Sequence, residues 1–288
     1  MLSYVQDFLA DIETSVKPAS RDAALAALRP LGLTEFGQLL WVSPLKDYPL
    51  LAQHLPPMSP PDVQARWTGS QGMLLLSQSL RFVQSCSENY TAVTGQSLKK
   101  ARILDFGCGY GRYLRLFSYY TDDLQGCDPW EVSLDQSRAA GFGDRVRKSD
   151  ALPQSLPFDM PFDFAFAFSV FTHLNEHATI LCLRALRLAV RQGGVLCITI
   201  RPPEYWQGHF EKHKGAPKGS LEHYVTTHKQ RGFAFFPHGT KPDDPMSTYG
   251  DSSMTLDCLA GLAKGWKIVA VDRALDDPMQ QYVFLQAI

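Results

Sequence analysis

The sequence has few cysteines, no long apolar run and no excess of charge of either sign. Its six cysteines show neither a C-x-x-C spacing nor a histidine at zinc-ligand intervals, so neither a metal site nor a disulfide framework is expected. We expect buried free thiols and a reducing, cytoplasmic setting. No apolar run approaches the roughly 18 to 20 residues that span a bilayer, and residues 1–11 already carry acids. We therefore expect neither a membrane span nor a signal peptide.

The charge balance is nearly even, with 28 Lys and Arg against 29 Asp and Glu in 288 residues. Bulk affinity for nucleic acid or an anionic membrane normally requires basic clusters, and the sequence contains no sustained basic run. We expect no nucleic-acid partner, no membrane partner, and a small-molecule substrate. The oligomeric state stays open, with a homodimer as one alternative.

The pattern of apolar residues changes near residue 97, so the chain is expected to have two regions. Residues 1–97 show helical apolar spacing, an irregular proline-rich connector over 41–62 and a long helix over about 70–94. We expect this region to be a helical extension or cap. From residue 98, short apolar runs alternate with amphipathic helices, which is typical of βαβ units and a parallel sheet. The predicted strands are 101–105, 123–128, 145–150, 162–169 and 195–200.

The last part of the chain breaks this alternation. Residues 202–250 are rich in histidine, proline and aromatic residues and have little periodicity, so we expect a substrate-facing insertion over the carboxyl edge of the sheet. A helix is predicted over about 252–264. The β runs 266–272 and 282–287 follow, and their short connection predicts an antiparallel hairpin.

The most informative stretch is ILDFGCGYGR, residues 103–112. An apolar strand ends in Asp105, three glycines follow at alternate positions, and a helical pattern begins at once. Glycine lacks Cβ, so such a turn can be tight and a ligand can lie on its backbone. A dinucleotide fingerprint places its third glycine three residues after the second. Arg112 occupies that position and Gly111 comes one residue early, which argues against a nicotinamide oxidoreductase.

The D-x-G-x-G-x-G pattern resembles motif I of the class I S-adenosylmethionine-dependent methyltransferases, and the terminal hairpin resembles their last strands. The resemblance covers roughly residues 100–288. It implies an α/β fold: a seven-stranded, mostly parallel Rossmann-like sheet with an antiparallel last strand, here as a domain over 98–288. It also implies S-adenosylmethionine as cofactor and methyl transfer as activity.

The resemblance assigns the first strand ends to the methionine and ribose parts of the cofactor. In the family, the acid matching Asp105 holds the ammonium region, and the backbone of Gly107, Cys108 and Gly109 approaches the cofactor directly. Asp128 ends the second strand, where a carboxylate can accept both ribose hydroxyls.

The adenine end is assigned in the same way. Pro129 and Trp130 match the apolar position against the adenine face, although core packing is an alternative for Trp130. Asp150 and Ala151 match the position that meets the adenine amino group, with a turn or helix cap as the alternative for Asp150.

The sequence SVFTHL, which begins at Ser169, resembles motif IV of the family and places Ser169 beside the cofactor. His173 in that motif either takes a proton from the acceptor or fixes the loop by bonding backbone. The insertion adds further histidines, of which one or two can face the substrate; His209 is our second candidate base. The five insertion histidines are His209, His213, His223, His228 and His238.

The acceptor is not fixed by these motifs. Enzymes that methylate adenine or glutamine nitrogen carry D/N-P-P-aromatic after the fourth strand, and this chain does not. We therefore predict metal-independent transfer to oxygen on a small molecule such as a sugar or secondary metabolite. A non-catalytic cofactor-binding scaffold is the alternative. Residues 66–69 either close over the cofactor or anchor a helix through Trp67.

Overall fold

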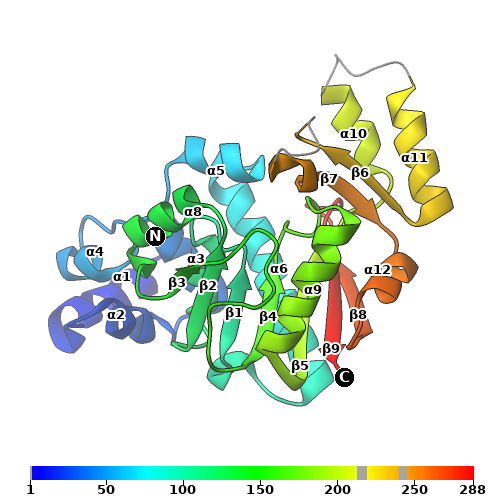
Figure 1. Cartoon of the computed structure of the whole chain (residues 1–288). Helices are drawn as coiled ribbons and strands as arrows, with labels where there is room; N and C mark the ends of the chain where they lie inside the picture. The colour runs from blue at the N-terminus through cyan, green and yellow to red at the C-terminus, as the bar shows by residue number, and fades with distance from the viewer. Residues whose placement is uncertain (1, 213–218, 240–244) are drawn as a thin grey trace.

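The computed structural model describes residues 2–212, 219–239 and 245–288. Seven strands form one sheet in the order β3-β2-β1-β4-β5-β9-β8 (Figure 1). Strands β1 to β5 pair in parallel, whereas β9 runs antiparallel to both β5 and β8. The predicted sheet with its antiparallel last strand is confirmed. The strands are β1 Ile103–Phe106, β2 Leu124–Asp128, β3 Val146–Lys148, β4 Phe162–Ala167, β5 Val190–Ile200, β8 Trp266–Arg273 and β9 Gln281–Ala287.

The central strand β4 is buried on both faces because its alternate side chains enter two different cores. Phe164 and Phe166 pack with α6, α7 and α8 on one face, and Ala165 and Ala167 pack with α9 and α12 on the other. In Figure 1, α6 passes behind the sheet and α9 in front of it. The helices are α6 Gly72–Thr94, α7 Arg112–Phe117, α8 Glu131–Ser137, α9 Glu176–Ala189 and α12 Leu256–Leu262.

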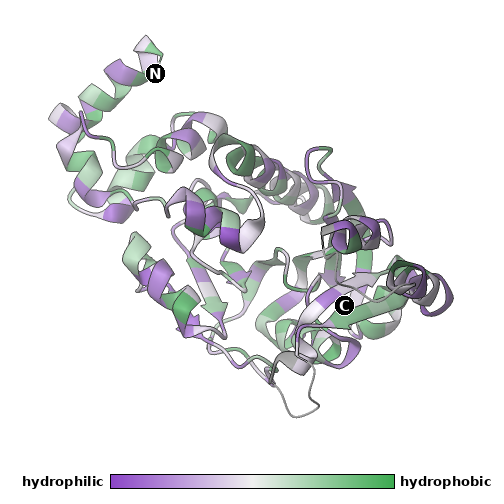
Figure 2. Ribbon diagram, turned by 90° about the horizontal axis from the view of Figure 1, so that it is seen from above, coloured by the Kyte–Doolittle hydropathy of each residue, from purple (hydrophilic) through white to green (hydrophobic). Residues whose placement is uncertain are grey.

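The first four N-terminal helices share a core of their own, and the N-terminal helices extend to one side of the sheet when the molecule is seen from above (Figure 2). They are α1 Ser3–Asp11, α2 Arg21–Leu28, α3 Leu33–Trp41, α4 Pro49–His54 and α5 Pro61–Thr68. The prediction of an irregular connector over 41–62 is partly wrong. Pro49 and Pro61 each begin a helix, because the first helical position needs no N–H donor and suits the φ of proline.

Ion pairs fasten the extension to the sheet. Arg21 Nη1 lies 2.8 Å from Asp144 Oδ1, and Arg145 Nη2 lies 2.6 Å from Asp22 Oδ2. The long helix α6 belongs to the core of the sheet rather than to the helical extension. The division of the chain near residue 97 stays a prediction.

The insertion folds into two helices and a two-stranded antiparallel sheet, and it rises above the carboxyl ends of the parallel strands (Figure 1). Its elements are α10 Tyr205–Lys212, α11 Ser220–Arg231, β6 Phe233–Pro237 and β7 Gly250–Met254. The helix predicted from residue 252 starts too early, because 252–254 belong to β7. Thr255 caps α12 by accepting from Cys258 N at 3.2 Å.

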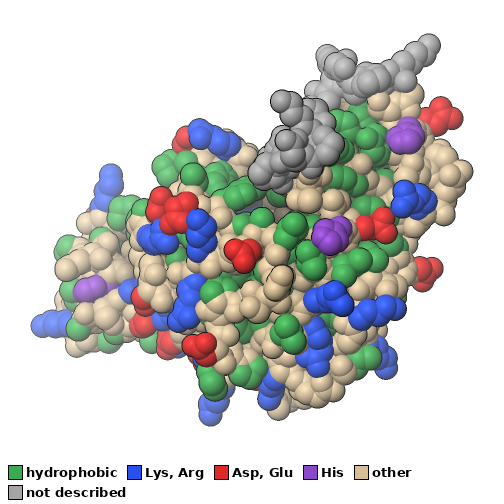
Figure 3. All heavy atoms as spheres, viewed as in Figure 1, with side chains coloured by type: hydrophobic (Ala, Val, Ile, Leu, Met, Phe, Trp, Pro, Cys, Tyr) green, Lys and Arg blue, Asp and Glu red, His purple; other side chains and the backbone are tan. Residues whose placement is uncertain are grey.

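Acidic and basic side chains are interspersed on the face shown in Figure 3. Among the described residues, none of the helices has the length and hydropathy needed to cross a membrane.

Candidate functional site

A cavity of about 1140 Å³ lies at the carboxyl ends of the strands. Its walls come from α5, the glycine turn, the ends of β2 to β5, the insertion and the β8–β9 loop, so segments far apart in sequence meet there (Figure 1). The predicted residues that line it are Gly107, Cys108, Gly109, Asp128, Pro129, Trp130, Asp150, Ala151, Ser169, His173 and His209. Asp105 does not line it.

The glycine turn needs glycine for both conformation and space. Gly107 has φ +80°, and a Cβ there would overlap Val170 Cγ2. Cys108 N and Gly107 N both donate to the Cys127 carbonyl, at 3.1 and 2.8 Å, so the turn is fastened to the end of β2. A side chain at position 107 would push the turn away from the β4 loop.

Asp128 is held in one orientation by the turn it faces. Its Oδ2 accepts from Gly109 N at 3.0 Å and its Oδ1 accepts from Trp130 N at 2.9 Å. Burial raises the pKa of Asp128, and these two hydrogen bonds oppose the rise. Each carboxylate oxygen has a further lone pair, so Asp128 can accept from a ligand diol while keeping both backbone bonds.

Asp105 lies below the cavity floor and is 2% exposed. Burial raises its pKa well above the usual range, and Asp128 adds to the rise. Its Oδ2 has no hydrogen-bond partner among the described residues. A buried polar atom of this kind calls for a partner, which fits a water or a cationic ligand group beneath the glycine turn. Its contact with the ammonium region stays a prediction.

Aromatic side chains form one rim of the cavity. Trp130 is 41% exposed, so its side chain lies on the cavity wall rather than in the core. Its ring meets Trp67 of α5 at 6.4 Å and Tyr249 at 5.0 Å, edge to face in both cases. Asp150 is exposed, and no helix begins there among the described elements, so helix capping does not explain it.

Ser169 has a left-handed backbone, with φ +58°, which is rare outside glycine and common at functional sites. Its N–H donates to Thr199 Oγ1 at 2.7 Å, and its Oγ accepts from Gln280 Nε2 at 3.3 Å. The strained turn after β4 is thereby fastened to β5 and to the β8–β9 loop.

His173 uses both ring nitrogens inside the protein. Nδ1 lies 2.6 Å from the Gly250 carbonyl oxygen, which can only accept, so Nδ1 carries the proton. Nε2 accepts from Arg201 Nη2 at 3.3 Å. Burial, together with the nearby Arg201 charge, lowers the pKa of His173 to about 4. The ring stacks on Tyr249 at 5.2 Å.

Asp251 on β7 is the centre of a polar cluster that the sequence analysis missed. Its Oδ1 accepts from Arg201 Nη1 at 2.6 Å and from Tyr205 Oη at 2.7 Å. Its Oδ2 lies 2.9 Å from His238 Nε2. Burial alone would raise the pKa of Asp251, but Arg201 and His173 outweigh it and hold the pKa well below the usual range. The only sequence signal was its place in the histidine-rich insertion.

His209 lies on α10 beside this cluster and is 6% exposed. Its Nδ1 is 3.3 Å from Tyr205 Oη and 3.6 Å from Asp251 Oδ2. Of the other insertion histidines, His238 also contacts Asp251, and His228 is buried against Ser253 Oγ at 2.8 Å. His213 lies outside the described residues.

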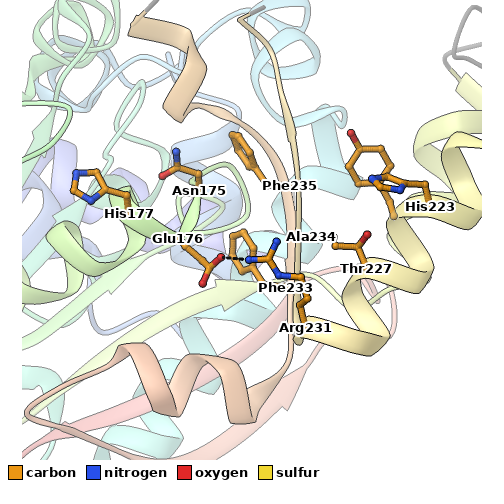
Figure 4. A pocket seen from close by; sticks show the side chains of 10 residues that line it. Asn175, Glu176, His177, His223, Thr227, Arg231, Phe233, Ala234 and Phe235 are labelled. Atoms are coloured by element: carbon orange, nitrogen blue, oxygen red, sulfur yellow. Dashed lines mark hydrogen bonds and ion pairs between the residues drawn. The ribbon is translucent and has the colours of Figure 1, made fainter. Parts of the chain in front are cut away.

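A smaller groove of about 380 Å³ lies between α9, β6 and α11. Figure 4 shows Asn175 and His177 on one side of β6 and His223 on the other. Glu176 and Arg231 bridge it at 3.3 Å. His223, one of the five insertion histidines, lines this groove, whereas the residues assigned to the cofactor, Asp105 apart, line the larger cavity. Over the described part of the chain, His, Cys, Asp and Glu form no group that could hold a metal ion.

The comparisons with known proteins agree with this geometry. A family profile described as "Methyltransferase domain" matches residues 104–198, which run from the glycine turn through β5. Residues 104–198 carry a methyltransferase domain, which supports the class I S-adenosylmethionine-dependent methyltransferase superfamily. The cofactor of this methyltransferase is S-adenosylmethionine, and the cavity fits it: the glycine turn admits a ligand on its backbone, and Asp105 Oδ2 lacks a partner among the described residues.

Several solved structures resemble the methyltransferase at low sequence identity. An S-adenosylmethionine-dependent methyltransferase from Mesorhizobium loti is 20% identical, with 69% of this chain and 96% of that chain covered and a TM-score of 0.46. Magnesium protoporphyrin IX methyltransferase from Synechocystis, solved with S-adenosylhomocysteine, is 12% identical, with 79% and 94% covered and a TM-score of 0.49. No curated protein sequence matched the chain.

Proposed function

We propose that the enzyme transfers the methyl group to an oxygen of a small molecule. The observation that carries the proposal is the Asp251 cluster, because it faces the same cavity as the glycine turn. The cavity is of the size that small-molecule sites have. Its far wall offers hydrogen-bonding side chains with balanced charge rather than the basic surface that nucleic acids require. The lack of a nitrogen-specific motif after β4 supports oxygen as the acceptor atom.

S-adenosylmethionine, when bound, supplies an electrophilic methyl carbon on a sulfonium sulfur. The residues of this chain that would hold it are the turn 107–109, Asp128 for the ribose, and Trp130 and Asp150 for the adenine. Fixing the acceptor oxygen in line with the methyl carbon can lower the barrier by about 7–11 kcal/mol. Positioning is therefore the main contribution of the protein.

We assign the role of general base, which takes the proton of the acceptor hydroxyl, to His209 rather than to His173. Asp251 beside Nδ1 of His209 favours the tautomer protonated at that atom and stabilises the imidazolium that forms. The lowered pKa of His173 disfavours its protonation near neutral pH. In this proposal His173 positions Arg201 and the β4 loop, and His209 contributes about 10²–10⁴ in rate.

A methyl-transfer screen tests the proposal. The full chain is incubated with methyl-labelled S-adenosylmethionine and separate pools of metabolites, proteins and nucleic acids. We expect label in the metabolite pool, in a product whose mass and fragmentation show an O-methyl group. Label in protein or nucleic acid, or an N-methyl product, would contradict it. No label in any pool despite cofactor binding would favour the non-catalytic scaffold.

The base assignment has its own test. With the acceptor found in the screen, His209→Gln should lower kcat at least about 100-fold and leave S-adenosylhomocysteine affinity unchanged. His173→Asn is the matched comparison and should lower kcat less. Near-normal turnover of His209→Gln would exclude it as the base.

A further inference from the structure

The outer edge of β8 is a row of backbone N–H and C=O groups that no described strand pairs with. β8 is the last strand in the sheet order, and only β9 lies beside it (Figure 1). The strand is accessible to solvent, because Val271 is 48% exposed and the side chains of Lys267 and Arg273 are exposed. Such an edge is a template for pairing with a strand of another chain.

A β-bulge determines which side chains of β8 share a face. The pairing with β9 shifts register between Ile268 and Ala270, so Val269 is the extra residue. Trp266 and Ile268 face the core that contains α9 and α12. Ala270 packs against the core on the side of α6. Beyond the bulge, the alternation of side chains is therefore displaced by one residue.

Lys267 and Asp272 consequently lie on the same face of the sheet. Lys267 stands between Trp266 and Ile268, so strand alternation points its side chain to the α6 side. Asp272 points to that side too, because its Oδ2 accepts from Ser85 Oγ of α6 at 2.5 Å. The two residues are five positions apart, and in a regular strand this odd spacing would place them on opposite faces.

This arrangement makes the β8 edge complementary to itself. When the bulged residue is left out, a two-fold axis through Ala270 and perpendicular to the sheet places Lys267 opposite Asp272 of a second copy, on matching faces. The same axis places Ile268 opposite Val271, which is an apolar pair on the other face. The axis generates each pair twice. Only a small side chain, Ala270, meets its own copy at the centre.

The two charges are not used within one chain. Among the described residues, the Lys267 ammonium has neither a hydrogen bond nor an ion pair, and the Asp272 carboxylate has no ion pair. Ser85 Oγ and Arg273 N donate to the two oxygens of Asp272, which orients the carboxylate and leaves each oxygen a lone pair. A lysine and a bulge can also serve to keep an edge unpaired, but that use does not call for an acid at the matching position.

We propose that two copies of this chain associate through antiparallel pairing of their β8 edges, so that their sheets form one continuous sheet. A second copy is the partner that fits, because an isologous contact requires the same surface to complement itself about one axis. No residue of β8 lines the large cavity, so the association leaves both cavities open. The proposal does not depend on the identity of the methyl acceptor.

Sedimentation of the full chain tests the proposal with a charge swap. Wild type should approach twice the 32.2 kDa mass of one chain as its concentration rises through roughly 1 to 100 μM. Lys267→Asp and Asp272→Lys each set like charges opposite one another twice per interface, so each should raise the dissociation constant at least about 10-fold. An equimolar mixture of the two variants should associate again, because every pair in the mixed dimer has opposite charges.

Lys46→Asp is the matched control. It makes the same charge change at an exposed residue of the helical extension and should associate like wild type. Each variant is first checked by thermal unfolding. Wild type that stays monomeric at about 100 μM would overturn the proposal. A dimer that folded Lys267→Asp does not weaken would overturn it as well, because another surface would hold the copies together. A mixture of the two folded variants that does not associate would also overturn the predicted register.

Discussion

Asp128 is a residue whose position the structure defines narrowly, because two backbone N–H groups fix its carboxylate at the cavity wall. Asp128→Ala removes the acceptors for the ribose hydroxyls, so we expect S-adenosylhomocysteine affinity to fall about 10- to 100-fold. Calorimetry measures the loss. Asp144→Ala, an acid on the far side of β3 paired with Arg21, is the control and should bind normally. Unchanged affinity of Asp128→Ala would refute the ribose assignment.

Asp277 makes stability depend on pH in a defined direction. Burial raises its pKa to about 6, so the folded chain holds this proton more tightly than the unfolded chain does. The charged carboxyl therefore costs stability above pH 6, and the cost vanishes below the unfolded pKa of roughly 3.9. Without ligand, Asp277→Asn should raise the free energy of unfolding by about 1–2 kcal/mol at pH 7.5 and leave it unchanged at pH 4.

Denaturant unfolding of wild type and Asp277→Asn at both pH values gives this difference. The charges that face Asp277 are Arg112, Asp276 and Arg201, and all three are retained in the variant. An equal effect at pH 4 and pH 7.5 would show that the charge of the carboxyl is not its cause.

The strand-end residues could be predicted because parallel strands bring their carboxyl ends to one edge. Asp128 and Asp150 follow from that rule. The contacts of Asp251 could not be predicted, since Arg201 and His238 reach it only after the insertion has folded. The hydrogen bonds of His173 to Gly250 and Arg201 could not be predicted either, and they favour the interpretation in which His173 fixes the loop.

At the scale of elements, α5 is the segment whose place matters most for the site. Fully buried Arg115 donates to the Pro57 carbonyl at 2.9 Å, and burial lowers its pKa to about 10. Gln64 accepts from Gly72 N at 2.9 Å and donates to the Ser59 carbonyl at 2.7 Å. These bonds fasten α5 beside the glycine turn, with Trp67 on the cavity wall.

Trp67→Ala should weaken S-adenosylhomocysteine binding about 3- to 10-fold, because it removes one wall of the aromatic rim. Trp67→Phe keeps a ring and should retain most of the affinity. Calorimetry or fluorescence titration measures both variants. If Trp67→Ala binds like wild type, the segment 66–69 anchors a helix and does not contribute to the cofactor site.

The helices and strands of the sheet and the helical character of the extension could largely be predicted from periodicity, whereas the helices of the proline-rich connector and the elements of the insertion could not. The prolines in 41–62 predict an irregular connector, but Pro49 and Pro61 occupy the first helical position, which tolerates proline. Strand β7 is short and polar, with the sequence GDSSM, and its partner β6 comes from the other side of a long loop. The pairing of β6 with β7 depends on tertiary contacts, and the local sequence pattern does not predict such contacts.

For the whole molecule, the helical extension and the insertion flank one cavity at the carboxyl edge of the sheet. The first supplies Trp67 at the cofactor end, and the second supplies the Asp251 cluster at the proposed acceptor end. This separation predicts that variants of α5 change cofactor affinity and that variants of the insertion change turnover. The near-zero net charge of −1 is consistent with a neutral or small acceptor.

The most direct measurement is a calorimetric titration of the full chain with S-adenosylhomocysteine and, in parallel, with NAD⁺. A methyltransferase site predicts binding of one S-adenosylhomocysteine per chain and no heat of binding with NAD⁺. Binding of NAD⁺ in its place, or no binding of S-adenosylhomocysteine by the folded chain, would contradict the assignment of this cavity.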